Sequence, residues 1–125
     1  MKDGLVHCIP AKSMIGVLNS GINPILKNYD CPELFVKIGI DEGENVVVQY
    51  AYDRSSQIDI LGYTMNISAK ITSLTGRNKV SIGENVYKLL HPGTKAEFHE
   101  LAYKTDEWKY TNLETGELYK VFTMN

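Results

Sequence analysis

Ile58-Asp-Ile-Leu-Gly-Tyr-Thr-Met-Asn-Ile-Ser-Ala-Lys70 joins a short apolar strand to an amphipathic helix through a glycine turn. Ile67, Ile71 and Leu74 repeat at i, i+4 and i+7, which is the spacing of an apolar helix stripe. The pattern predicts a strand over residues 57–61, followed by a helix over 63–74 that packs on a sheet.

Polar residues of the same stretch form a candidate binding site. Asn66 and Lys70 are four residues apart, so on a helix they project from the same side, one turn above the other. Asp59 stands at the end of the preceding strand. An amide and a cation on a helix beside an aspartate can together bind a base, a sugar and a phosphate.

Composition limits the class of protein. A chain of 125 residues with 43% hydrophobic content predicts one globular domain, and at this length folding buries roughly two-thirds of the accessible surface. The net charge of -2, without a basic patch, argues against nucleic-acid binding. Cys8 and Cys31 are too few and too scattered for a disulfide framework or a metal cluster, which favours a reduced, cytoplasmic setting. Without a long apolar run or a signal peptide, we expect no membrane contact by this segment.

The remaining pattern predicts alternating strands and helices. We expect a strand over 5–9 that Pro10 ends, and a helix over 11–28 with a break near Asn23, because Gly21 and Pro24 interrupt it. The turn at Gly43 predicts an antiparallel hairpin from residues 34–40 and 46–52. Further elements are expected over 79–82, 84–90, 108–111 and 118–123. This order predicts an α+β fold, an antiparallel sheet of about five strands with the 11–28 and 63–74 helices on one face.

Several segments together resemble the class III nucleotidyl cyclases, the adenylate and guanylate cyclases. The segment from Asp59 to Lys70 is similar to the family's Asp-x-x-Gly-x-x-Val-Asn-x-Ala-Ala-Arg motif. Two more stretches match in order, Leu34-Phe-Val-Lys-Ile-Gly-Ile-Asp-Glu-Gly43 and Lys79-Val-Ser-Ile-Gly-Glu-Asn-Val-Tyr87. The resemblance runs from Asp3 to the end and implies a ferredoxin-like palm. Residues 1–125 would form one cyclase-like domain that lacks the family's N-terminal strand and helix.

The resemblance also implies roles for four residues. Asp59 would accept a hydrogen bond from the adenine amino group, and Asn66 would orient the ribose. Lys70 stands where the family has an arginine that binds the triphosphate. Asp3, followed by Gly4, resembles the aspartate that is the family's second metal ligand, which implies Mg²⁺ or Mn²⁺ in a complete domain. The implied substrate is ATP or another nucleoside triphosphate, bound at the interface of a homodimer.

Three departures from the family leave two functions open. The Phe-x-Asp-Ile segment of the first metal site is absent from these residues, Lys2 replaces a glycine, and lysine at position 70 lacks the planar fork of arginine. One reading is a portion of an adenylate cyclase-like domain that is inactive as an isolated chain. The other is a non-catalytic nucleotide-binding, dimerisation or regulatory module. The site residues also have structural alternatives: a turn for Asp3, a helix cap for Asp59, and solvated surface positions for Asn66 and Lys70.

Overall fold

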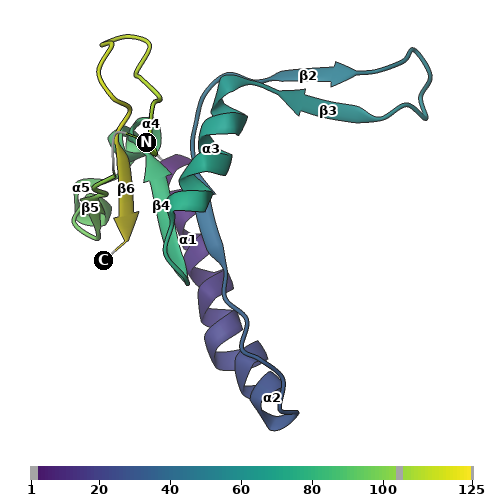
Figure 1. The fold of residues 1–125 in the computed structure, drawn as a ribbon, viewed down its shortest axis with the longest axis vertical. Coiled ribbons are helices and arrows are strands. Elements are labelled where there is room, and N and C mark those ends of the chain that lie inside the picture. The colour runs from purple at the N-terminus through teal and green to yellow at the C-terminus, as the bar shows by residue number, and fades with distance from the viewer. Residues whose placement is uncertain (1–2, 104–105, 125) are drawn as a thin grey trace.

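The computed structural model describes residues 3–103 and 106–124, and side chains from Cys8 onward (Figure 1). A helical rod begins the chain, a small sheet forms the body, and a two-stranded hairpin projects from it (Figure 1). The rod comprises α1 (Asp3–Val17), the π-helical turn η1 (Leu18–Ile22) and α2 (Asn23–Asn28). The remaining elements are β1 (Lys37–Ile40), β2 (Val46–Gln49), β3 (Ile58–Leu61), α3 (Tyr63–Leu74), β4 (Lys79–Gly83), α4 (Glu84–Leu89), α5 (Pro92–Lys95), β5 (Phe98–Glu100) and β6 (Val121–Met124).

The main sheet is mixed, with strand order β1-β4-β6-β5. β1 runs parallel to β4, with Ile38 opposite Val80 and Ile40 opposite Ile82. β6 lies antiparallel to both β4 and β5. β4 is the central strand, and its residues from Val80 to Gly83 are buried because both faces of the sheet are covered.

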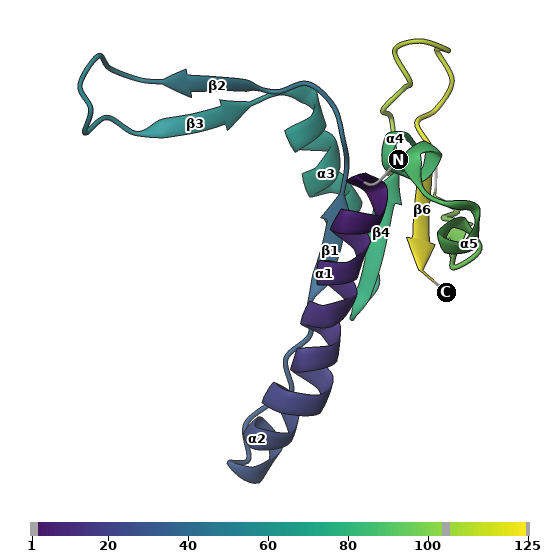
Figure 2. The ribbon, with the colours of Figure 1, turned by 180° about the vertical axis from the view of Figure 1, so that it is seen from behind.

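The two long helices cover opposite faces of this sheet (Figures 1 and 2). Cys8 and Ala11 of α1 belong to a core cluster with Val80 and Ile82. Ile67 and Ile71 of α3 belong to a second cluster, which also contains Trp108, Tyr119 and Val121. The expectation that both helices lie on one face is wrong. The structure differs because residues of β4 and β6 alternate between the faces, and each face carries its own apolar cluster.

Gly39 explains how closely α3 approaches the sheet. A Cβ atom at this position would lie 2.3 Å from Thr72 Oγ1 and 2.6 Å from the backbone nitrogen of the same residue. Real carbon atoms do not approach so closely, so only glycine allows the backbone of β1 to contact the helix.

The expected hairpin between residues 34–40 and 46–52 is wrong. β2 pairs instead with β3, in the register Val47 opposite Ile60 and Val48 opposite Asp59. β1 gains more from β4, where Ile38 and Ile40 meet apolar partners that are shielded from water. The β2–β3 hairpin therefore leaves the body at the turn after β1 and extends away from it (Figure 1).

The N-terminal region is helical where a strand was expected over residues 5–9. The backbone of α1 runs from Asp3 to Val17 with Pro10 inside it. Among the described residues, no strand pairs with this segment, and an unpaired strand would leave its backbone groups unsatisfied. The expected break near Asn23 is a π-helical turn, in which the helix continues past Gly21 and Pro24.

The α+β class of a cyclase-like domain is confirmed. The strand before α3, α3 itself, β4 and α4 lie where the sequence predicted them. Within the described residues, no helix is long and apolar enough to cross a membrane.

Candidate functional site

Asp59 and the pair Asn66 and Lys70 lie on either side of one tight connection. β3 carries Asp59 and ends at Leu61, and α3 begins two residues later. Gly62 makes the connection, and a Cβ atom there would lie 2.5 Å from Asn45 Oδ1. Glycine therefore lets the two segments at the root of the hairpin, around Asn45 and Gly62, approach each other closely.

Asp59 is exposed, and its carboxylate is held by two hydrogen bonds. The hydroxyl of Tyr50 donates to Oδ2 at 3.1 Å, and the backbone N–H of Ile60 donates to Oδ1 at 2.8 Å. The bond to Asp59 raises the pKa of Tyr50, because loss of the phenolic proton would place two negative charges together. The sequence analysis did not identify Tyr50, since its contact with Asp59 depends on the β2–β3 pairing.

Asn66 and Lys70 lie on an exposed side of α3. Their neighbours Ile67 and Ile71 are buried, so the apolar stripe that the sequence predicted is the face of α3 that packs on the sheet. In the described part of the chain, neither the Asn66 amide nor the Lys70 ammonium makes a side-chain hydrogen bond or ion pair. Both groups are thus available to a ligand.

Asp3 is the first residue of α1, and its side chain lies outside the described part of the structure. Its role as a metal ligand stays a prediction. Among the described residues, no group of three or more histidine, cysteine, aspartate or glutamate side chains could hold a metal ion. Mg²⁺ is usually bound by one or two carboxylates together with substrate phosphates and water, and Asp3 is the carboxylate that the sequence offers for this role.

A second polar cluster joins the end of β1 to the C-terminal region. The hydroxyl of Tyr119 donates to Asp41 Oδ1 at 2.6 Å and accepts from the backbone N–H of Asn85 at 3.1 Å. Buried Glu84 accepts a hydrogen bond from the side-chain amide of Asn112. Burial raises the pKa of Asp41, and the bond from Tyr119 partly offsets that rise.

This cluster borders a cavity of about 350 Å³ whose lining includes Asp41, Tyr63, Asn112 and Tyr119. Asp59, Asn66 and Lys70 are not among the lining residues. The cluster around Asp41 and Tyr119 is therefore separate from the three residues predicted from the sequence. Sequence analysis missed this cluster, because it depends on contacts between residues far apart in the chain, and its one sequence signal was an aspartate directly after an apolar strand.

Comparisons with known proteins indicate the family and the fold of the chain. The sequence matches the profile of the adenylate and guanylate cyclase catalytic domain over residues 14–122. The structure is similar to the crystal structure of the guanylyl cyclase Cya2, with a TM-score of 0.71 at 16% sequence identity. The match covers 98% of this chain and 57% of that one, so the chain spans little more than half of that structure. No curated protein sequence matches. At this identity the structural likeness shows the fold alone.

Proposed function

The chain belongs to the adenylate and guanylate cyclase catalytic domain family, and we propose that it is the nucleotide-binding portion of an adenylate cyclase-like domain. The observation that carries the proposal is the exposed pair of Asn66 and Lys70, which have no side-chain partner in the described structure and lie on the helix that follows the strand of Asp59 in the chain.

Each of the three side chains suits one part of a nucleoside triphosphate. The Asp59 carboxylate only accepts hydrogen bonds when ionised, so it suits the amino group of adenine. The Asn66 amide both donates and accepts, as a ribose hydroxyl requires. The Lys70 ammonium is a compact positive charge that attracts phosphate. Tyr50 and the Ile60 amide hold the Asp59 carboxylate in one orientation before any ligand arrives.

The reaction of a complete domain would convert ATP to cyclic AMP and pyrophosphate. The ribose 3′ oxygen forms a bond to the α-phosphorus, the bond to pyrophosphate breaks, and the hydroxyl proton must be accepted. A bound Mg²⁺ or Mn²⁺ would supply charge compensation in such a domain. The Phe-x-Asp-Ile segment of the family's first metal site is absent from residues 1–125, so we propose that this chain alone has negligible cyclase activity.

We further propose that the chain forms a homodimer through the β2–β3 hairpin. Val46, Val47 and Ile58 are 62%, 66% and 63% exposed, although all three are apolar. An isolated two-stranded hairpin is at best marginally stable in water, and clustered exposed apolar residues mark interaction surfaces. A second copy that covers the hairpin would account for both features.

The alternative is a non-catalytic module that binds a nucleotide or regulates attached domains. Lysine at position 70 favours it, because an ammonium keeps the charge of arginine but cannot make two parallel hydrogen bonds to phosphate. The first candidate and the nucleotide-binding form of the second both predict nucleotide binding, and only the first predicts turnover in a longer parent that supplies the metal-binding carboxylates.

Isothermal titration of the purified chain with ATP and GTP tests the binding claim. We expect ATP to bind more tightly than GTP, and Lys70→Ala to weaken ATP binding by about tenfold, or roughly 1.4 kcal/mol. The matched control is Lys27→Ala, which removes an exposed helical lysine of α2, far from the site. Equal effects of the two substitutions would contradict the proposal, since they would reflect net charge alone.

A further inference from the structure

The cavity beside Asp41 lies where five segments of the chain meet. The turn after β1 contributes Asp41 and Glu44, and the N-terminal part of α3 contributes Tyr63 and Ile67. The loop 111–114, Asn85 and Tyr119 complete the lining. Its volume of about 350 Å³ falls within the range of small-molecule sites, which is roughly 300–1,000 Å³.

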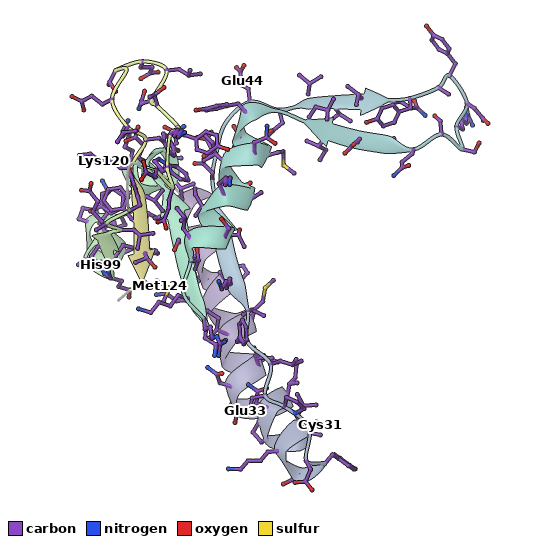
Figure 3. The ribbon with its side chains drawn as sticks, viewed as in Figure 1. Cys31, Glu33, Glu44, His99, Lys120 and Met124 are labelled. Atoms are coloured by element: carbon purple, nitrogen blue, oxygen red, sulfur yellow. The ribbon has the colours of Figure 1, made fainter. Side chains whose placement is uncertain are left out.

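The charged residues that line the cavity are all acidic. Asp41, Glu44 and Glu114 line the cavity, whereas no lysine, arginine or histidine is among its lining residues in the part of the chain that the structure describes. Glu44 stands at the root of the hairpin, next to the start of α3 (Figure 3). Three carboxylates without a cation repel a phosphate or a nucleotide and attract a positively charged group.

The other walls are aromatic and aliphatic. Tyr63 and Tyr119 supply rings, and Ile67 and Leu113 supply aliphatic surface. The Tyr63 hydroxyl donates to the backbone carbonyl of Thr111 at 3.3 Å, which ties α3 to the loop across the cavity. Tyrosine rings attract cations through their faces, and apolar walls favour a ligand with an apolar body.

Asp41 is held in place for such a ligand. Its carboxylate accepts from Tyr119 at 2.6 Å and from the backbone of Glu42. A carboxylate has about four acceptor positions, so others remain available. No ion pair to Asp41 occurs among the described residues. Partial burial raises the pKa of this carboxyl group, because desolvation disfavours its charged form and its hydrogen bonds offset that effect only in part.

We propose that this cavity, here named the Asp41 pocket, binds a small organic cation, with an ammonium or amidinium group at Asp41 and an aromatic body against the apolar part of the lining. The site goes beyond the proposed nucleotide function and is independent of it, because Asn66 and Lys70 are not lining residues. A ligand there would contact the root of the hairpin and the start of α3 together, and so would restrict how they move relative to each other.

The test compares three probes that share one ring and differ in charge: benzylammonium, benzyl alcohol and benzoate. Calorimetry on the purified chain should show saturable binding of benzylammonium, at least tenfold tighter than benzyl alcohol, and no binding of benzoate. Amide chemical-shift changes should concentrate in residues 41–44, 63–67 and 111–114. No saturation by about 10 mM benzylammonium, which marks binding too weak to be specific, or equal binding of the alcohol would overturn the proposal.

Substitutions of the lining residues test whether the ammonium group binds at Asp41. Asp41→Asn should weaken benzylammonium binding at least tenfold, whereas Glu42→Gln removes the same charge one residue away, outside the lining, and should change it less than twofold. Leu113→Arg is a second test that avoids the buried cluster, because Leu113 is 83% exposed. The arginine should compete with the ligand and also weaken binding tenfold. Unchanged binding in both lining variants would overturn the proposal, as would loss of binding on dimerisation, which would show that a second copy fills the pocket.

Discussion

The hydroxyl of Tyr119 lies 2.6 Å from the carboxylate of Asp41, so one hydrogen bond joins the end of the first sheet strand to the C-terminal region. The same hydroxyl oxygen accepts from the amide at the start of α4, 3.1 Å away. Gly83 leaves room for this contact, because a Cβ atom there would lie 2.2 Å from Asp41 Oδ1. The bond therefore depends on three separate segments being in place.

Tyr119→Phe should destabilise the fold. The substitution keeps the ring in the core but removes one of the hydrogen bonds to the half-buried Asp41 carboxylate and leaves the backbone amide of Asn85 without its partner. The loss of such partners typically costs about 1–3 kcal/mol. Urea denaturation measures the loss in the free energy of unfolding. Tyr110→Phe is the matched control, since no hydrogen bond of its hydroxyl occurs in the described structure, and it should cost much less. Equal costs would show that ring packing accounts for the effect.

Stability should depend on pH through Asp41. Burial raises its pKa above the ordinary value of 3.8, so the native state binds the proton more tightly than the unfolded chain. Between 3.8 and the raised pKa, the free energy of unfolding therefore falls as pH rises. Asparagine at position 41 cannot titrate, so Asp41→Asn should remove this decrease in the free energy of unfolding. Glu42→Gln should retain it. Parallel pH profiles for Asp41→Asn and the unsubstituted protein would contradict the assignment.

Gly39→Ala and Gly16→Ala should have opposite effects. An added methyl group at position 39 would overlap the backbone of α3, and overpacking of this kind costs about 1–3 kcal/mol or more. At position 16, in α1, no atom lies within 4 Å of the added group, and alanine in a helix stabilises by roughly 0.5–1 kcal/mol over glycine. Thermal unfolding of both variants checks the pair. A tolerated alanine at position 39 would mean that α3 is farther from β1 than described.

The hairpin should control self-association. Val47 and Ile60 are cross-strand neighbours, 66% and 46% exposed. Replacing both with lysine would put two charges into the proposed dimer interface, and we expect a monomer by sedimentation. Ile25→Lys serves as control, because Ile25 is 58% exposed on α2, at the other end of the molecule. A dimer that survives the double substitution would show that another surface mediates it.

Lys70→Arg should tighten triphosphate binding. Arginine restores the planar fork that makes two parallel hydrogen bonds to phosphate oxygens, and charge-assisted bonds of this kind are about twice as strong as neutral ones. Titration should show a severalfold gain for ATP and little gain for adenosine, which carries no phosphate. An equal gain for both ligands would place the side chain away from the phosphates.

The local pattern of the sequence predicted the elements from 57 to 90 well, although at residues 5–9 it predicted a strand where the structure has a helix. The helix over 63–74 has the predicted bounds because its apolar stripe and its glycine turn agree. Pairing was less predictable. Residues 34–40 and 46–52 both have strand composition, but only the three-dimensional structure shows that β1 pairs with β4 and that β2 pairs with β3.

The same distinction holds for the two polar regions. Asn66 and Lys70 share a side of one helix, and helical spacing alone predicts that relationship. Asp41 and Tyr119 are separated by 78 positions in the chain, and no local period connects them. The Asp41 pocket therefore could be found only in the folded structure.

The hairpin is also nearly independent of the body that carries it. β2 and β3 contact each other, and neither makes a comparable set of contacts with any other element that the structure describes. Its root is narrow, formed by the turn at Gly43 and by Gly62. Natural variation or protein engineering could thus exchange residues 46–61 for a hairpin of different charge while the rest of the domain still folds. Two chains with complementary hairpins would then form heterodimers in preference to homodimers, so dimerisation specificity could evolve separately from the nucleotide site.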